Sequence, residues 1–448
     1  MSWLGAHLAA VLTLAVVLPL ALVLLQQRRQ PQSTLAWLIG LVLVPWVAAP
    51  LFAMLGFRKS ARRSPASRVE SAGPATDLPA IMARLGAPPA RDGHAIELLG
   101  GGEAAFARLL STIRGAERTI DAQFYLVQDD PVGRAFVDAL TERARAGLRV
   151  RLILDRLGGF ARPHAALRDF RAAGGVLRDF SPLLHRPDRG HVNLRNHRKM
   201  LLADGRTVFA GGMNVGHDYM GPGADPTRWI DLAFLLRGPA VRDYAALFRS
   251  DWAVVGGAPD DGPATEAEPS GTARAQLVAS GPDVPLDALH DGLVSGIHRA
   301  ASRVWIATPY FVPTESLAEA LALAGRRGLD VRILVPRRSN HPVTDFARGA
   351  YLRGLAECGC RILFHETRMV HAKAGVIDAV AWVGSANFDV RSMLLNFESA
   401  LLLPGGGEAE AVAAWFEDCA RGCTTRMPAP GPLRRLGEGL FRLGTPLL

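Results

Sequence analysis

Cysteine is scarce in this chain of 448 residues, which contains four: Cys358, Cys360, Cys419 and Cys423. A small secreted fold that is held together by disulfide bonds needs a higher density of cysteine, so this class is excluded. The spacings C-x-C and C-x-x-x-C are not completed by further cysteine or histidine residues into a tetrahedral zinc pattern. We therefore interpret the four side chains as reduced, structural thiols.

Asp, Glu, Lys and Arg are absent from residues 1–27 and again from residues 30–57. Each run is long enough to cross a hydrocarbon layer of about 30 Å as a helix. A cleaved signal peptide is disfavoured for the first run, because no basic residue precedes it and its apolar stretch is too long. The sequence therefore predicts a hairpin of two transmembrane helices over residues 1–59.

Basic residues next to these runs predict the orientation of the hairpin. The connecting loop holds two of them, whereas the segment after the second run holds five: Arg58, Lys59, Arg62, Arg63 and Arg68. Because the more basic flank stays on the cytoplasmic side, we expect the rest of the chain on that face. The formal net charge of +9 favours an anionic partner, which can be nucleic acid, an anionic membrane surface or a substrate with a phosphate group.

Two long segments of the remaining chain repeat one pattern of alternating strands and helices. The stretches "RARAGLRVRLIL" and "AGRRGLDVRILV" nearly superimpose, and similar strands precede them. This order predicts an internal duplication in which each half is a mixed, mostly parallel sheet flanked by helices. The predicted organisation is a hairpin (1–59), a linker (60–90), a first α/β domain (91–255), a linker or loop (256–274), a second α/β domain (275–425) and a basic amphipathic C-terminal tail (426–448).

Each half carries the spacing H-x-K-x4-D, which is formed by His197, Lys199 and Asp204 in "NHRKMLLADG" and recurs in "HAKAGVID". The second copy consists of His371, Lys373 and Asp378. In a strand, residues two apart share a face, whereas residues seven apart lie on opposite faces. Each histidine can therefore meet a substrate together with its lysine. The aspartate falls on the opposite face, where it braces the strand end or pairs with a nearby cation.

Each motif is followed by a glycine–asparagine turn and then by an acid in an apolar context. The turns "GGMN" and "GSAN" end at Asn214 and Asn387, whose amides can donate to a phosphoryl oxygen. The acids are Asp231 and Glu398, and an inward-facing carboxylate there needs a partner. An imidazole N–H is the natural one, because the pair fixes the tautomer of the ring.

If the two halves face each other, two histidines, two lysines and two asparagines converge on one pocket. This set lacks the carboxylate-rich shell that Mg²⁺ or Ca²⁺ prefers, and instead forms a cationic cradle for a tetrahedral anion. One imidazole can attack phosphorus while the other protonates the leaving oxygen, which gives a phosphohistidine intermediate. The sequence predicts no metal ion or other cofactor.

The paired motifs and their turns resemble the signature of the phospholipase D superfamily. Longer stretches, including "QFYLVQDDPVGRAFVDAL", "TPYFVPTESLAEAL" and "GSANFDVRSMLLNFE", resemble the bacterial cardiolipin synthases within it. The resemblance implies an α/β fold of two tandem phospholipase-D-like domains with pseudo-two-fold symmetry after the transmembrane hairpin. It also implies a multi-pass enzyme of the bacterial cytoplasmic membrane that joins two phosphatidylglycerol molecules and releases glycerol.

The resemblance places the histidine, lysine and aspartate of both motifs in the family's active-site signature, and Asn214 and Asn387 among its phosphate contacts. It leaves open which histidine is the nucleophile, the donor and acceptor lipids and the oligomeric state. Another phosphatidyltransferase, a phospholipase or a synthase that uses phosphatidylethanolamine would share the same pocket. A nuclease is disfavoured because the membrane spans place the pocket beside lipid and no nucleic-acid-binding signature is visible.

Overall fold

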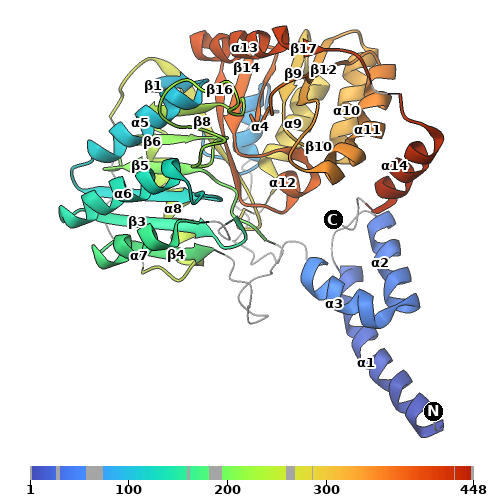
Figure 1. The fold of residues 1–448 in the computed structure, drawn as a ribbon. Helices are drawn as coiled ribbons and strands as arrows, with labels where there is room; N and C mark the ends of the chain where they lie inside the picture. The colour runs from blue at the N-terminus through green and yellow to red at the C-terminus, as the bar shows by residue number, and fades with distance from the viewer. Residues whose placement is uncertain are drawn as a thin grey trace.

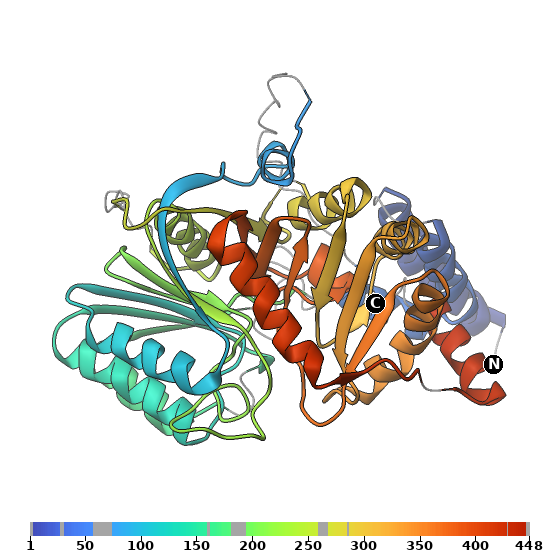
Figure 2. The ribbon, with the colours of Figure 1, turned by 90° about the horizontal axis from the view of Figure 1, so that it is seen from above.

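The structure is a computed structural model that describes residues 3–26, 31–56, 74–158, 162–180, 194–258, 268–284, 286–427 and 429–444. Two α/β halves lie side by side, and the N-terminal helices extend away from them (Figure 1). The C-terminal helix α14 (Pro432–Gly444) lies beside the N-terminal helices in both views (Figures 1 and 2).

The first half begins with the long strand β1 and ends with the helix α8. Its elements are β1 (Arg91–Leu99), α5 (Gly102–Arg114), β2 (Thr119–Phe124), α6 (Pro131–Arg145), β3 (Arg149–Asp155), α7 (His164–Ala172), β4 (Val176–Phe180), β5 (Met200–Ala203), β6 (Thr207–Gly211), β7 (Ala233–Arg237) and α8 (Val241–Val254).

The second half repeats this order with small additions. Its elements are β8 (Ala273–Ser280), α9 (Ala288–Arg299), β9 (Arg303–Ala307), β10 (Phe311–Val312), α10 (Glu315–Arg326), β11 (Asp330–Pro336), α11 (Pro342–Glu357), β12 (Arg361–His365), β13 (Ala374–Ile377), β14 (Val380–Gly384), β15 (Phe388–Asp389), α12 (Val390–Leu394), β16 (Glu398–Pro404), α13 (Gly406–Arg421) and β17 (Cys423–Thr424).

All strands except β10 and β15 form one sheet in the order β17-β12-β11-β9-β13-β14-β16-β8-β1-β7-β6-β5-β2-β3-β4. Read outward from the β1–β8 pair, the two sides carry corresponding strands in the same sequence. The predicted duplication and tandem α/β fold are therefore confirmed. The expectation of a mostly parallel sheet was wrong, because helical crossovers join only β2 to β4 and β9 to β12, while the motif strands are short antiparallel hairpins.

The junction between the halves is a continuous apolar core rather than a loose contact. It includes Tyr244, Phe248 and Trp252 of α8 together with Val412 and Phe416 of α13. Helix α13 crosses this junction and contacts both β1 and β8 (Figure 2). Burial of side chains from both halves in one core fixes how the halves face each other, and this positions the motifs that meet between them.

The predicted second membrane span is not one continuous helix. The run contains α2 (Pro31–Leu43) and α3 (Pro45–Leu55), which are separated at Val44. Proline at the first position of α3 lacks the N–H that would continue α2, so the chain turns there. The two helices pack together with α1 (Trp3–Gln26), and Trp37 meets Phe52 edge to face at 5.2 Å. In the part of the chain that the structure describes, we find no helix that is both long and apolar enough to cross a membrane.

Two segments that the sequence assigned to linker and tail contain helices. The predicted linker includes α4 (Leu78–Arg84), which buries Leu78 and Met82 against α9. Asp77 caps this helix by accepting a hydrogen bond from Ala80 N at 2.8 Å, a frequent helix start. In the tail, α14 packs on α11, and most of the predicted linker between the transmembrane run and α4 lies outside the described residues.

Candidate active site

The two motifs lie in extended segments that directly precede β5 and β13, and each is held by the backbone of the other half. The amide N–H of His197 donates to Phe397 O at 2.9 Å, and that of His371 donates to Ile230 O at 2.7 Å. Isolated bridges pair Asn196 with Phe397 in the same region. Neither histidine is therefore positioned by its own half alone.

Each histidine is paired with the acid of the opposite half. Nδ1 of His197 lies 3.0 Å from both carboxylate oxygens of Glu398, and Nδ1 of His371 lies 2.6 Å from Oδ2 of Asp231. An Nδ1–H that donates to the carboxylate leaves Nε2 with a lone pair for attack or proton transfer. The sequence predicted Asp231 and Glu398 as partners of the histidines, but it did not predict that the pairing crosses between the halves.

Both motif lysines are buried beside their histidines. Lys199 Nζ donates to His197 O at 2.6 Å, and Lys373 Nζ lies 2.9 Å from Nε2 of His371. Lys199 and Lys373 are 1% and 2% exposed, so their charges lie in a site that is nearly closed to water. An ammonium group in such an environment acts on an anion much more strongly than it would in bulk solvent.

Burial is the largest cause of the pKa shifts of the histidines and of Lys373 in this cluster. It lowers the pKa of His371 to about 3, reinforced by the nearby charge of Lys373, and it lowers the pKa of His197 against the opposing effect of Glu398. Burial also lowers the pKa of Lys373 to about 8. Lys373 contributes to the lowering at His197, and Lys199 to that at His371, so each half feels the charge of the other. In the site without substrate, burial thus favours the neutral imidazole at both positions, as a nucleophile requires, whereas an acid needs a protonated ring, which the negative charge of a bound phosphodiester favours.

The two asparagines that end the glycine turns are also buried. Asn214 is 2% exposed and Asn387 is 6% exposed. Among the described residues, none donates a hydrogen bond to the side-chain Oδ1 atom of either asparagine. A buried amide oxygen without a donor is costly, and it is the amide nitrogen of each side chain, not this oxygen, that can donate to a phosphoryl oxygen.

The two turns differ at one position, and the paired acids explain the difference. A Cβ atom at Gly212 would lie 2.2 Å from Oδ1 of Asp231, so the short aspartate side chain requires glycine there. In the other half, Ser385 replaces this glycine, and its Oγ donates to Oε2 of Glu398 at 2.6 Å. The change from GG to GS thus accompanies the change from aspartate to glutamate.

Aromatic residues that the sequence did not indicate surround the histidines. Tyr125 meets His197 at 5.2 Å between ring centroids, and Tyr219 and Trp229 meet His371 at 5.0 and 5.4 Å. They come from loops that follow β2 and the first glycine turn, so no motif spacing marks them. Their rings help to exclude water from the imidazoles.

Asp204 and Asp378 lie away from the histidines, in the turns at the far ends of β5 and β13. The Asp204 carboxylate accepts backbone N–H groups of Glu117, Arg118 and Thr119 at 2.8–2.9 Å. Asp378 does the same with residues 301–303 and also accepts from Ser302 Oγ at 2.8 Å. Both have positive φ angles, 54° and 51°. Their side chains brace the strand ends and lie apart from the motif histidines and lysines, which agrees with the prediction that they do not share the face of the histidines.

Replacing Asp378 by asparagine is expected to lower the free energy of unfolding by about 1–2 kcal/mol while leaving turnover per folded molecule unchanged. Burial raises the pKa of Asp378, but its hydrogen bonds outweigh burial and bring the pKa below 3.8. The carboxylate therefore contributes stability at neutral pH that is lost as the pH falls through this depressed value. Thermal unfolding and activity of the variant test this, and a large loss of kcat without loss of stability would contradict the bracing role.

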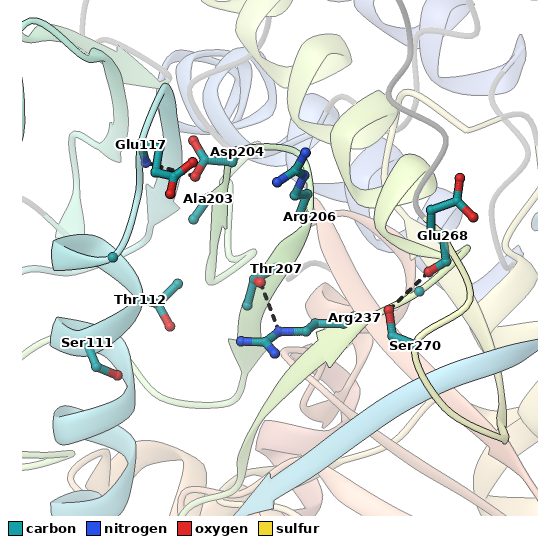
Figure 3. A pocket seen from close by; sticks show the side chains of 12 residues that line it. Ser111, Thr112, Glu117, Ala203, Asp204, Arg206, Thr207, Arg237, Glu268 and Ser270 are labelled. Atoms are coloured by element: carbon teal, nitrogen blue, oxygen red, sulfur yellow. Dashed lines mark hydrogen bonds between the residues drawn. The ribbon is translucent and has the colours of Figure 1, made fainter.

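A surface cleft of about 630 Å³ opens at the Asp204 end of the first half, and neither motif histidine nor lysine lines it. Figure 3 shows Asp204, Arg206 and Arg237 around this cleft, with Arg237 donating to Thr207 Oγ1 at 3.2 Å. The cleft is thus separate from the buried cluster of motif histidines and lysines.

Comparisons with known proteins agree with this geometry. A family model described as the PLD-like domain of cardiolipin synthase matches residues 109–252 and 293–420, which are the two repeated segments. The chain is 31% identical to cardiolipin synthase of Geobacillus kaustophilus, over 98% of this chain and 94% of that protein. It is 35% identical to cardiolipin synthase A of Pseudomonas fluorescens, over 72% of this chain and 67% of that protein.

Among solved structures, phosphatidylserine synthase of Haemophilus influenzae superimposes with a TM-score of 0.60 at 15% identity, over 78% of this chain and 94% of that one. At this identity the likeness concerns the fold. The duplicated sheet, the crosswise histidine–acid pairs and the family match over both halves lead to one conclusion: this chain belongs to the cardiolipin synthase family of phospholipase-D-like proteins.

Proposed function

We propose that the chain is a membrane-associated phosphatidyltransferase that makes cardiolipin from two phosphatidylglycerol molecules and releases glycerol. The observation that carries this proposal is the buried cluster in which both crosswise histidine–acid pairs and both motif lysines meet. The names of the related proteins supply the lipid product, and the cluster supplies a chemistry that can make it.

The reaction takes place in two displacements at one phosphorus atom. In the first, Nε2 of one histidine forms a bond to phosphorus, and the bond from phosphorus to the glycerol oxygen breaks. The second histidine, which must enter this step as an imidazolium, gives the proton on its Nε2 to that oxygen and becomes neutral. In the other displacement, a hydroxyl oxygen of the accepting phosphatidylglycerol bonds to phosphorus, its proton passes to the second histidine, and the phosphorus–nitrogen bond breaks. As a working assignment, His197 is the nucleophile and His371 the acid and base.

The remaining site residues support these displacements. Lys199 and Lys373 offset the negative charge that develops on the phosphoryl oxygens, and Asn214 and Asn387 donate hydrogen bonds to them. Asp231 and Glu398 hold each ring with its proton on Nδ1 and stabilise the imidazolium that forms. The proposal includes no metal ion, so we expect full activity in the presence of EDTA.

The rate should fall on the alkaline side of a pH near 8. Lys373 carries its charge below its pKa of about 8 and loses it above, so kcat/KM for phosphatidylglycerol decreases as pH rises through that value. The variant Lys373→Arg keeps its charge, so its alkaline limb should move to higher pH even where its rate is lower. A pH profile of the variant that matches the unaltered enzyme would assign the limb to another group.

Attachment to the membrane is proposed for the N-terminal helices. Large apolar side chains are exposed along α1 and α2, for example Leu14 and Leu18 (62% each) and Val42 and Leu43 (71% and 73%). Exposed apolar surface on this scale is typical of a lipid-contacting segment. With the unequal numbers of flanking basic residues, it supports catalytic halves on the cytoplasmic face of the bacterial inner membrane.

Purified enzyme in detergent micelles that contain phosphatidylglycerol and EDTA tests the proposal. We expect cardiolipin and free glycerol in equal amounts. Phosphatidic acid as the sole lipid product would indicate a hydrolase, and loss of activity with chelator would contradict the metal-free site. Adding phosphatidylethanolamine or serine distinguishes other phosphatidyltransferases, because their headgroups would then appear as leaving group or acceptor.

A further inference from the structure

Arg198 stands between the histidine and the lysine of the first motif, and its side chain is fully buried. Residues two apart in an extended segment share a face, so Arg198 lies on the opposite face from His197 and Lys199. The corresponding residue of the second motif is Ala372. The histidine–lysine chemistry itself therefore does not require a guanidinium group at this position, and its burial in one repeat needs another reason.

The guanidinium group of Arg198 reaches into the second half and binds the backbone at Glu398. Its Nε donates to Glu398 O at 3.1 Å, and its Nη2 donates to Ser280 O at 3.1 Å. These two residues pair with each other where β16 begins and β8 ends. The ring of Phe397, the residue before Glu398, has its centre 5.2 Å from Cζ of Arg198. One side chain of the first half thus fixes the backbone that carries the acid partner of His197.

A buried carboxylate holds this guanidinium group and the chain on both sides of His197. Arg198 Nη1 donates to Oδ1 of Asp251 in α8, whose side chain is also fully buried. Oδ2 of Asp251 accepts a hydrogen bond from Asn196 Nδ2 at 3.3 Å, and Asn196 Oδ1 accepts one from the N–H of Arg198 at 3.0 Å. The residues before and after His197 are therefore anchored to α8, while the guanidinium group anchors Glu398.

The second repeat has neither member of this ion pair. Cys419 stands three residues after Phe416 of α13, as Asp251 stands three residues after Phe248 of α8. An ion pair that is removed from water gains little stability over apolar residues of similar size, because both charges lose their hydration. Stability therefore explains poorly why one repeat has the pair, whereas its contacts with the residues around His197 and with Glu398 indicate a role at the first motif.

We propose that Arg198 and Asp251 are positioning residues that set the Glu398 carboxylate against the ring of His197. The inference depends on the proposed function, because it concerns a histidine that acts on the phosphodiester. His197 and Glu398 come from different halves, and their 3.0 Å contact requires both backbones to be held together. The guanidinium group meets this need because it is a planar fork that binds two carbonyls and a carboxylate at once. It keeps Nδ1 of the ring on the acid, which leaves Nε2 directed at phosphorus.

Arg198→Lys tests the proposal, because lysine keeps a positive charge beside Asp251 but lacks the fork that reaches both carbonyls. In micelles of phosphatidylglycerol, we expect kcat for glycerol release to fall about tenfold while KM stays within about twofold, since misplacing a catalytic group impairs the transition state more than binding. In a Glu398→Gln background, the same substitution should lower kcat by less than about a further twofold, because Arg198 acts through Glu398. A general loss of stability would not produce this dependence on Glu398.

Arg151→Lys is the matched control. Arg151 forms a buried ion pair with Asp121 in the same half, and its guanidinium group lies over the rings of Phe248 and Trp252. The control variant changes a buried arginine in the same way but away from Glu398, so its kcat per folded molecule should stay within about twofold of the unaltered enzyme.

A second variant, Arg198→Met combined with Asp251→Asn, removes both charges and leaves neither buried without its partner. It should lose kcat per folded molecule at least as far as Arg198→Lys, and thermal unfolding measures the folded fraction. An unchanged kcat in either variant, or a tenfold loss that persists in the Glu398→Gln background, would overturn the positioning role. Unaltered enzyme that releases glycerol but forms no cardiolipin would instead overturn the proposed function, and the comparison of glycerol release would still decide the role of Arg198.

Discussion

Replacing either His197 or His371 by alanine is expected to lower cardiolipin formation by about 10³-fold or more. Each ring has a separate task at the same phosphorus, and neither the lysines nor the asparagines can form the covalent intermediate or carry the proton. Because residues that act as one unit are not additive, the double variant should be about as inactive as either single variant. Initial rates of glycerol release and of cardiolipin formation measure the effect.

The two single variants also need a control for folding. Alanine at position 197 removes one partner of the buried Glu398 carboxylate, which keeps its hydrogen bond from Ser385 Oγ, so thermal unfolding of the variant must be measured beside its activity. Substantial cardiolipin formation by either folded variant would refute a site in which both rings are required.

Replacing either of the paired acids is expected to have a second large effect on turnover, which tests the crosswise pairing. Glu398→Gln and Asp231→Asn should each lower turnover by about 10²-fold or more, because the neutral amide no longer stabilises an imidazolium. Glu398 should share the kinetic defect of His197, although it belongs to the other half, and Asp231 should share that of His371. In single turnovers, the release of glycerol and the transfer to the acceptor are measured separately, which identifies the step that each variant impairs.

We expect each acid variant to be impaired in the same step as the variant of the histidine that it contacts in the other half. If the variant at Glu398 instead shared the defect of the variant at His371, the acids would act within their own halves, and the pairs would not work as the distances indicate. Gln and Asn preserve side-chain volume, so that both variants fold and the comparison remains one of charge.

The sequence was sufficient to predict the duplication, the tandem α/β halves and the residues of the cluster. Strand parity also predicted that Asp204 and Asp378 do not share the face of the histidines, because residues seven apart in a strand lie on opposite faces. The paired motifs carry this information locally, within about eight residues of each histidine. Identifying the acids needed a further step, namely that a carboxylate in an apolar strand requires a partner.

What the sequence could not predict depends on how the halves meet. The crosswise pairing arises because β1 and β8 join the halves at the centre of one sheet, and no local spacing encodes that contact. Tyr125, Tyr219 and Trp229 reach the site from loops for the same reason. Hydropathy predicted a second span as one unit, whereas the backbone of Pro45 divides the run into α2 and α3. The domain boundaries and the catalytic roles remain predictions.

The most direct measurement is an experimental structure of the enzyme with vanadate, which mimics a phosphoryl group in transfer. We expect one vanadate per chain, bound between the halves, with Nε2 of one histidine bonded to vanadium and Nε2 of the other within about 3 Å of the opposite apical oxygen. Two separate anions, each held by one histidine and its lysine, would contradict the claim that both rings act on a single phosphorus atom.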